Sequence, residues 1–424
     1  MTTRFFRILI HYLLTRSLLI PVVAILWLGA DFTLAAETIK FALIEPLSGP
    51  FANVGNNNLR SFSAEFDRIN TRGGVLGRNF EVVGFDNKSN PQETALQLQA
   101  AVDRDIRYVM QAAGSNNGHA LSDAVAKHNA RNPDRPVLYL NFGALDPALT
   151  TEKCHFWHFR FASHGHMIMA AVTDAIARNR EIKRVYLIDQ DYVWGRSVAA
   201  DAREMLSVKR PDIQIVGDDL HPIAKVKDFA PYVAKVKAAR ADAIVTGNWG
   251  NDLALLVKAA KESDLKIEIY APIAGLPGSP AMIGEAGANR TRAALFWHAN
   301  IEPNALLAAA QAFKAKYKED WNWLPTYLMP NMVVAAMKKA ESAEPMQVAI
   351  ALEGLKYAGP TGEVWMRPED HQIMMPIYET VFVRVGEGGV KYDAEDTGLG
   401  WKTEGKLDTE DNVPPITCRV QRPQ

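Results

Sequence analysis

Cysteine is scarce in this sequence, and no charge of one sign is in surplus. Only Cys154 and Cys418 occur among the 424 residues, which allows one internal disulfide at most. The 47 Lys and Arg residues almost match the 48 Asp and Glu residues, and no run of like charges stands out. A balanced charge of this kind gives no indication of a nucleic-acid partner.

Motifs of hydrolytic and phosphate-dependent enzymes are also missing. The sequence has no G-x-S-x-G elbow, no H-E-x-x-H helix and no P-loop. GNWGND, residues 247–252, superficially resembles a nucleotide-binding loop, but it lacks the third glycine and the acidic residue of a dinucleotide site. We therefore predict no catalytic residues and no cofactor.

The N-terminal segment has the pattern of a secretory signal peptide. Three arginines precede the apolar run SLLIPVVAILWLGA of residues 17–30, which ends at Asp31 before the stretch TLAAE, with cleavage expected near Ala35 or Ala36. The run is shorter than the roughly 20 residues of a membrane-spanning helix, although an uncleaved anchor is the alternative interpretation. We predict that residues 1–36 are removed on export.

Export favours a disulfide between Cys154 and Cys418, because an even pair of cysteines in an oxidising compartment is usually bonded. Such a bridge would tether the C-terminal tail. Two distant free thiols are the alternative, since the sequence does not show whether the two Cα atoms approach within about 7 Å.

Short apolar, β-branched runs alternate with longer segments of helical period after residue 36. This order predicts an α/β fold with parallel sheets covered by helices. The final third differs, because it begins with three successive helices at 305–317, 327–341 and 346–355, followed by strands at 362–366 and 378–385. The earlier predicted strands are 39–44, 79–83, 106–110, 137–140, 185–188, 213–216, 243–246, 266–270 and 294–297, and the helices are 59–70, 93–103, 119–129, 167–178, 198–206, 229–239 and 252–261.

Two loops in the first half follow predicted strands, at the carboxyl ends where open α/β sheets bind ligands. GSNNGH, residues 114–119, offers the Ser115 hydroxyl and the exposed N–H groups of a helix start, which suit a carboxylate or another acceptor. Turn chemistry of the Asn-Gly pair is the alternative explanation. NFGALDP, residues 141–147, has the same placement.

Two later loops, DQDYVWG at 189–195 and GNWGND at 247–252, add Trp194 and Trp249. A single tryptophan in a loop usually serves packing alone. Two tryptophans at equivalent strand ends, facing one cleft, would form an apolar clamp, and we favour this interpretation.

The segment IKFALIEPLSGPFANVGNNNLRSFSAEFDRINTRGGVLGRNFEVVGFDNKSNPQETA resembles the N-terminal lobe of periplasmic binding proteins for branched-chain amino acids. It carries LSGP, INxxGGVxG and an acidic-Asn-Pro segment in the family's order, and the similarity extends from about residue 39 to about residue 382. The resemblance implies the substrate-binding subunit of an ABC importer, located in the periplasm, with the type I periplasmic binding fold.

That fold has two Rossmann-like lobes joined by three crossings, expected near Ser163, Trp297 and Pro368. The resemblance implies that a small-molecule ligand binds between the lobes and that closure presents it to the membrane permease. We expect a monomer, since the lobes must open and close freely. The implied parts are lobe 1 (residues 37–163 and 298–368), lobe 2 (residues 164–297 and 369–400) and a tail (residues 401–424) tied back to lobe 1 by the disulfide.

The resemblance also implies ligand contacts. A serine that binds the ligand carboxylate, backbone donors after the fourth strand and two aromatic residues of the second lobe all have counterparts in the loops described above. The residues expected at the ligand are Ser115, Asn116, Gly143, Ala144, Leu145, His164, Trp194, Trp249 and Ile273.

Three positions depart from the family pattern. Leu145 replaces a threonine at the ligand's head group, and Val54 replaces an aromatic residue after LSGP. The acidic residue that pairs with the ligand's ammonium aligns with Ile273, and an unpaired buried ammonium is costly. Either Asp189, Asp191 or another acid replaces it, or the ligand has no ammonium. We expect a small apolar or aromatic carboxylate, an amide or a hydrophobic amino acid.

CHFWHFRFASHGH, residues 154–166, has the composition of a metal site. As a strand over 154–162 it would direct His155 and His158 to opposite faces and separate Cys154 from His158 by about 13 Å, at about 3.3 Å per residue. Zinc ligands converge at about 2.0–2.3 Å, so we predict no metal. The segment would complete the first sheet and cross the hinge, where His164 lies beside the cleft.

Two other functions stay open at this point. The same closing fold serves sensors that present a ligand to a membrane receptor, and an exported enzyme is the third alternative.

Overall fold

The computed structural model describes residues 37–423 of the chain. The predicted signal peptide and its cleavage position lie outside the described residues. Residues 38–424 form one compact unit, and the description below concerns that unit. None of the helices within residues 37–423 is both long and apolar enough to cross a membrane.

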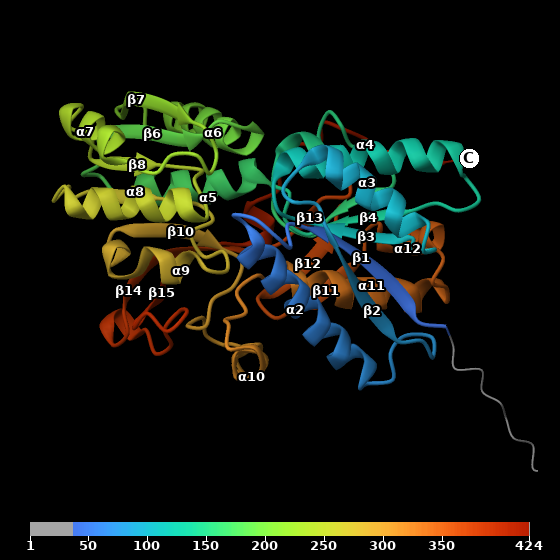
Figure 1. The fold of residues 1–424 in the computed structure, drawn as a ribbon. Helices are drawn as coiled ribbons and strands as arrows, with labels where there is room; N and C mark the ends of the chain where they lie inside the picture. The colour runs from blue at the N-terminus through green and yellow to red at the C-terminus, as the bar shows by residue number, and fades with distance from the viewer. Residues whose placement is uncertain (1–36, 424) are drawn as a thin grey trace, which may run out of the picture. The chain divides into compact units, whose positions relative to one another are not determined.

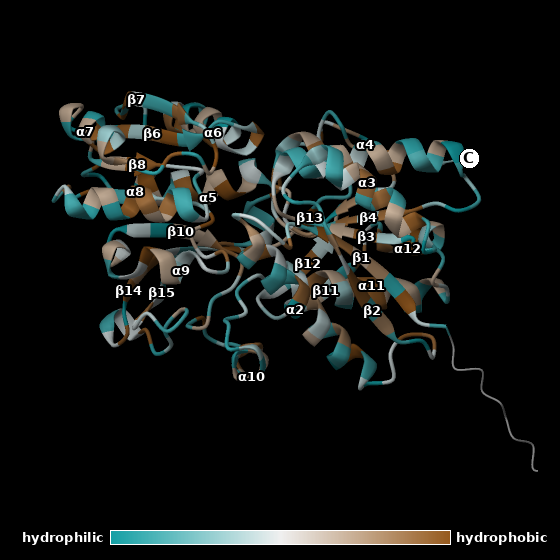
Figure 2. Ribbon diagram, viewed as in Figure 1, coloured by the Kyte–Doolittle hydropathy of each residue, from teal (hydrophilic) through white to brown (hydrophobic). Residues whose placement is uncertain are grey.

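Five parallel strands form the first sheet, in the order β2-β1-β3-β4-β5. Helices α3 and α4 pack together on one face, and α2, α11 and α12 pack on the other (Figure 1). The strands are apolar because helices cover both faces of the sheet, as the brown strands in Figure 2 show. These elements are β1 (Ile39–Glu45), β2 (Phe80–Asp86), β3 (Tyr108–Gln111), β4 (Leu138–Asn141), β5 (His158–Arg160), α2 (Ala52–Asn70), α3 (Pro91–Val102), α4 (Ser115–Arg131), α11 (Pro325–Ala340) and α12 (Pro345–Leu352).

The second sheet has seven strands in the order β15-β14-β10-β9-β8-β6-β7. All its pairs are parallel except those that β14 forms with β10 and β15. Its apolar residues divide between a core under α5 and α6 and another under α7 and α8. These elements are β6 (Arg184–Gln190), β7 (Gln214–His221), β8 (Ala243–Val245), β9 (Glu268–Tyr270), β10 (Thr291–Leu295), β14 (Ile377–Arg384), β15 (Leu399–Leu407), α5 (Gly165–Arg178), α6 (Val193–Lys209), α7 (Ala230–Ala238), α8 (Asn251–Glu262) and α9 (Ser279–Ile283).

A small third sheet follows the helices of the final third. It consists of β11, β12 and β13 in sequence order, all antiparallel. The prediction of an α/β fold with parallel sheets between helices is confirmed, while α9, β11, β13 and β15 were not predicted. The remaining elements are α10 (Leu307–Tyr317), β11 (Lys356–Gly359), β12 (Gly362–Met366) and β13 (Ile373–Met374), with one-turn 3-10 helices at Pro147–Thr150, Gly284–Gly287, Glu387–Gly389 and Thr409–Asp411.

We call the five-stranded sheet with its helices, together with α10 and the three-stranded sheet, lobe 1, and the seven-stranded sheet with its helices lobe 2. The chain passes from one sheet to the other between β5 and β6, after β10, and before β14. The third passage does not lie at Pro368, because Gln372 still accepts a hydrogen bond from Arg160 of β5 at 2.8 Å and β13 still pairs with β12. We keep the division into two lobes as a proposal and move its third boundary to about residue 375.

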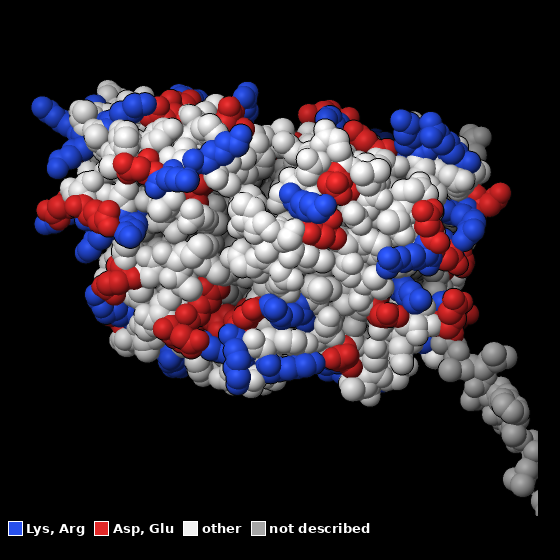
Figure 3. Space-filling model, in the orientation of Figure 1, with Lys and Arg blue, Asp and Glu red and all other residues white. Residues whose placement is uncertain are grey.

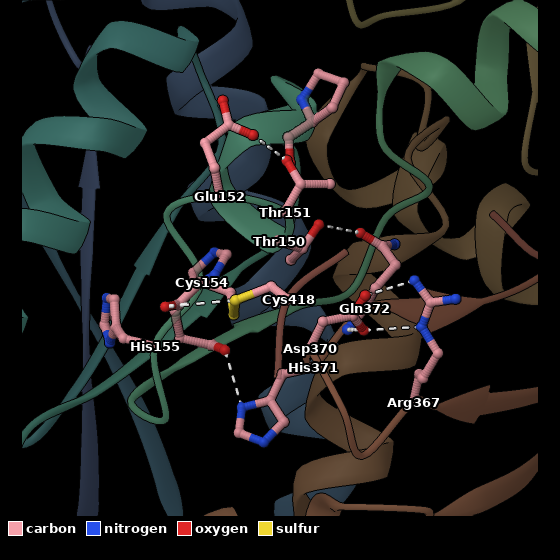
Figure 4. Close-up of a disulfide and its surroundings, with 12 residues drawn as sticks. Thr150, Thr151, Glu152, Cys154, His155, Arg367, Asp370, His371, Gln372 and Cys418 are labelled. Carbon is pink, nitrogen blue, oxygen red and sulfur yellow. Dashed lines mark hydrogen bonds and ion pairs between the residues drawn. A yellow bond between two sulfur atoms is a disulfide. The ribbon is translucent and has the colours of Figure 1, made fainter. Parts of the chain in front are cut away.

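The C-terminal tail is shorter than predicted. Residues 401–407 belong to β15, which pairs with β14 along its length. After Leu407 the chain returns to lobe 1, where the Thr409 hydroxyl donates to the Glu363 carbonyl at 2.9 Å. Cys418 is bonded to Cys154, with 6.3 Å between their Cα atoms (Figure 4), so the predicted disulfide is confirmed and the free-thiol alternative is wrong.

Candidate ligand-binding site

A small pocket lies where loops at the carboxyl ends of both large sheets meet. Lobe 1 contributes the loops after β3 and β4, and lobe 2 contributes the loops after β6, β8 and β9. Parallel strands bind ligands at this end because their loops converge there. The lining residues are Val54, Asn58, Ala112, Ala113, Gly114, Ser115, Gly143, Leu145, Tyr192, Trp194, Trp249, Ile273, Leu276 and Trp323.

Most of the residues that the sequence placed at the ligand meet in this pocket. Val54 lines it as well, at the position where the family pattern has an aromatic residue. Three predicted residues are absent from the described lining: Asn116, Ala144 and His164. The six that the structure brings together are Ser115, Gly143, Leu145, Trp194, Trp249 and Ile273.

The three tryptophans of the pocket offer it carbon surface only. The indole N–H of Trp194 donates to the Gly247 carbonyl at 2.8 Å. That of Trp249 donates to the Tyr192 hydroxyl at 2.8 Å, and that of Trp323 donates to the Phe142 carbonyl at 2.7 Å. Because each polar tip is bonded within the protein, the rings are held in place and favour an apolar or aromatic body.

Of the backbone donors expected after β4, at Gly143 to Leu145, those of Gly143 and Ala144 are already used. The side-chain oxygen of Asn141 accepts the N–H groups of Gly143 at 3.0 Å and Ala144 at 2.8 Å. Arg160, fully buried, donates to the carbonyls of Ala144 at 3.0 Å and Asp146 at 2.7 Å and so fixes the same loop. The predicted role of Gly143 and Ala144 as ligand donors is therefore wrong for this arrangement of the loop, in which Gly143 serves as a wall.

Ser115 is the polar residue that agrees best with its prediction. It lies on the first turn of α4 and is 3% exposed, and its hydroxyl accepts the N–H of Asp146 at 3.2 Å. The hydroxyl proton stays available to an acceptor in the pocket. Asp146 also forms an ion pair with His119, and a hydrogen bond from that ring lowers the pKa of the Asp146 carboxyl despite its burial.

His164 has a structural role that the sequence did not indicate. It is the N-cap of α5, where its Nδ1 accepts the N–H of Met167 at 3.3 Å. Burial lowers the pKa of His164 well below its usual value, which keeps the ring neutral and able to accept. Asn116 is exposed on α4, and Ala144 is buried against Gly118.

Neither acid proposed as a substitute at the ammonium position lies in the pocket. Asp189 is fully buried behind Trp194, and one of its oxygens accepts the N–H of Gly247 at 2.5 Å. Burial raises the pKa of Asp189. Asp191 is exposed and pairs with Arg196 at 2.6 Å. Among the described lining residues none is Asp, Glu, Lys, Arg or His.

Another acid lies directly behind the pocket. Glu45, the last residue of β1, accepts the N–H groups of Ala112 at 2.6 Å and Ala113 at 2.9 Å. Its second oxygen accepts the side-chain N–H of Asn58 at 3.1 Å. Glu45 was not among the predicted site residues, although it stands as a charged residue at the end of an apolar strand. Tyr192 and Trp323 also line the pocket. Tyr192 lies in the loop DQDYVWG, and Trp323 follows Trp321 by two residues.

The two lobes touch around the pocket. Phe51 of lobe 1 stacks on Trp249, and Asn53 donates from its side chain to the Pro277 carbonyl at 3.3 Å. Lys314 of lobe 1 pairs with Asp396 of the β14–β15 connection at 2.7 Å. On the face drawn in Figure 3, charged side chains gather toward the edges and the middle is mostly uncharged.

The segment of residues 154–166 differs from its prediction. Only His158–Arg160 is strand, and a turn before it bonds the His158 N–H to the His155 carbonyl at 3.2 Å. This turn brings the two imidazole rings to 6.1 Å, so the prediction of opposite faces is wrong. Within residues 37–423, no three His, Cys, Asp or Glu side chains are grouped to hold a metal.

Comparison with known proteins assigns the family. A family model described as periplasmic binding protein matches residues 38–389. The chain belongs to the periplasmic binding protein family. A Leu/Ile/Val-binding protein homolog 4 from Brucella abortus is 32% identical over 406 residues, which is 92% of this chain and 94% of that protein.

Solved structures of periplasmic binding proteins agree with the fold. The closed conformation of a Leucine-, isoleucine-, valine-, threonine-, and alanine-binding protein from Brucella ovis has a TM-score of 0.80 and 28% identity, and the match covers 92% of this chain and 100% of that one. An ABC-transporter solute binding protein from Rhodopseudomonas palustris BisB5, in complex with 3,4-dihydroxy benzoic acid, has a TM-score of 0.75 and 22% identity, covering 88% and 98%. The predicted fold class and family are confirmed.

Proposed function

We propose that this periplasmic binding protein captures a small apolar or aromatic carboxylate or amide, or a hydrophobic amino acid, between its lobes and delivers it to the membrane permease of an ABC importer. The observation that carries the proposal is the pocket itself, in which strand-end loops of both lobes enclose one volume walled by Trp194, Trp249 and Trp323. A pocket between two lobes that is largely apolar and has a few polar groups suits a small molecule.

The described lining residues include no charged side chain, and this restricts the class of ligand that the pocket can bind. An ammonium group would meet no carboxylate among the described lining residues. Ile273 is one of them, and it is the residue that the sequence resemblance aligns with the family's acid. A ligand without an ammonium avoids that desolvation cost. We therefore place carboxylates and amides with apolar or aromatic bodies ahead of amino acids.

Relatives support both branches of this ligand class. The similar protein from Brucella ovis is named for leucine and other amino acids, and the one from Rhodopseudomonas palustris was solved with an aromatic acid. The same fold therefore accommodates both head-group types. Location in the periplasm follows from the proposed removal of residues 1–36, which N-terminal sequencing of the mature protein tests.

Thermal shift across a ligand panel tests the proposal. The panel contains hydrophobic amino acids, aromatic and branched aliphatic acids, and their amides, and a true ligand at 100 times its Kd adds about 2.7 kcal/mol to the free energy of unfolding. Trp249→Ala should reduce the shift, to about 1.4 kcal/mol or less for a Kd raised at least tenfold, while Trp365→Ala, which lies outside the pocket in β12, should keep it. Absence of any stabilising panel member, or turnover of one, would contradict the proposal.

A further inference from the structure

Glu45 is a buried carboxylate that shares its partners with the pocket. Its side chain is 0% exposed, and its three hydrogen-bond donors belong to Asn58, Ala112 and Ala113, all of which line the pocket. Within residues 37–423, no Lys, Arg or His forms an ion pair with it. A ligand in the pocket is thus separated from this carboxylate only by the groups that bond to it.

The Glu45 carboxylate accepts backbone N–H groups that a ligand carboxylate would otherwise use. The N–H groups of Ala112 and Ala113 point at Glu45, and those of Gly143 and Ala144 point at Asn141. A ligand carboxylate and an ionised Glu45 would then be two like charges in a site with little water. Like charges in such surroundings favour protonation of one of them.

The groups around Glu45 leave it free to take that proton. Asp86, its register partner on β2, turns its carboxylate to the N–H groups of Leu47 and Lys88. Tyr139 on β4 donates its hydroxyl to Gln111 at 2.8 Å, and Asn58 on α2 is neutral. Burial raises the pKa of Glu45 to about 7, against hydrogen bonds that lower it.

We propose that a carboxylate ligand enters this pocket together with one proton, which Glu45 takes up from solvent as the ligand binds. The inference rests on the proposed function and adds a rule to it: affinity for carboxylates depends on pH, and affinity for amides does not. The proton bonds to one Glu45 oxygen, and rotation of the Asn58 amide lets its oxygen accept that O–H. The other Glu45 oxygen continues to accept from Ala112 and Ala113, so no other bond changes.

Calorimetric titration with matched probes tests the inference. Benzoate and 4-methylpentanoate are compared with benzamide and 4-methylpentanamide from about pH 5.5 to about pH 8.5, where both acids are ionised. Above pH 7, uptake of one proton should raise the Kd of the carboxylates by up to about tenfold per pH unit, and the amides should show a flat profile. In wild-type protein near pH 8, the binding enthalpy should vary with the ionisation enthalpy of the buffer by close to one proton.

Glu45→Gln is the matched variant, because its side-chain oxygen still accepts from Ala112 and Ala113. It should bind carboxylates with a flat pH profile. A slope that persists in this variant would assign the titration to another group and would overturn the inference. If wild type binds carboxylates with an affinity that does not change with pH, only this inference is overturned. If wild type binds amides and no carboxylate, again only this inference is overturned. If no probe binds, the proposed function is contradicted as well.

Discussion

Trp249 of lobe 2 stacks on Phe51 of lobe 1, with 4.1 Å between their ring centroids and 27° between their planes. Phe51 directly precedes α2, and Trp249 lines the pocket. The contact thus joins the two lobes at the edge of the ligand site. An aromatic pair of this kind contributes about 0.5–1.5 kcal/mol beyond its buried area.

Phe51→Ala should weaken ligand binding by favouring separated lobes. We expect the Kd for the ligand found in the panel to rise by about two- to tenfold, which corresponds to the free energy of the lost pair. Small-angle scattering should show a larger radius of gyration for the ligand-free variant. Phe51→Tyr keeps the ring and should resemble the wild type; equal affinity of Phe51→Ala and wild type would show that the stack does not hold the lobes.

Ser115→Ala should lower affinity for carboxylates and should also cost about 1 kcal/mol of stability, because the Asp146 N–H loses its acceptor. Loss of one hydrogen bond to a charged group raises the Kd about tenfold or more. Ser122→Ala is the matched control on the same helix, because the Ser122 hydroxyl bonds to His155 at 2.8 Å, away from the pocket. Similar losses in both variants would assign the effect to α4 as a whole.

Stability should depend on pH through two buried glutamates. Burial raises the pKa of Glu45 and of Glu395 from 4.5 to about 7, so the folded state binds these protons more tightly than the unfolded chain. The resulting stabilisation is fully present below about pH 4.5 and lost as the pH rises through about 7, by about 3 kcal/mol for Glu45.

Urea unfolding at several pH values measures this slope. Relative to wild type, Glu45→Gln should gain stability as the pH rises from about 4.5 to about 7, because it has no proton to lose. Glu395→Gln, whose parent carboxylate accepts the N–H groups of Gly278 and Ala281, should show a similar gain. A constant difference from wild type across this window would contradict the assignment.

Cys418→Ser should destabilise the protein by freeing the tail. The disulfide links residues 264 positions apart, and long loops lose the most unfolded-state entropy when closed, typically about 2–4 kcal/mol in measured stability. Cys154→Ser should give the same loss, and reductant should lower the melting temperature of wild type but of neither variant. Retained stability would show that contacts such as Val420 N–H to the Glu369 carbonyl at 2.7 Å hold the tail unaided.

Sequence pattern located the loops of the site but not the hydrogen bonds within them. Ser115, Trp194 and Trp249 could be predicted to share one pocket, because the carboxyl ends of parallel strands converge whatever the side chains are. The sequence pattern did not show that Glu45 takes backbone donors, since Glu45 reaches them across strands through tertiary contacts. Asn141 takes its donors two and three residues later in its own loop, and this local turn was not predicted either.

The predicted boundaries of lobe 1 and of the tail were wrong where tertiary contacts override the local sequence pattern. Residues after Pro368 stay with lobe 1 because Arg160 bonds to Gln372. β15 extends through polar residues of the predicted tail because it pairs with β14, which a weakly apolar sequence does not reveal. Trp323 follows no predicted strand, so its place in the pocket could not be predicted from the ends of the strands.

Calorimetric titration of the ligand panel into wild type and Trp249→Ala tests the central claim most directly. We expect one panel member, a carboxylate or amide with an apolar body, to bind wild type with one site per chain and to bind Trp249→Ala at least tenfold more weakly, which equals about 1.4 kcal/mol. Equal binding to both proteins would contradict the assignment of this pocket, and binding of no panel member would contradict the proposed ligand class.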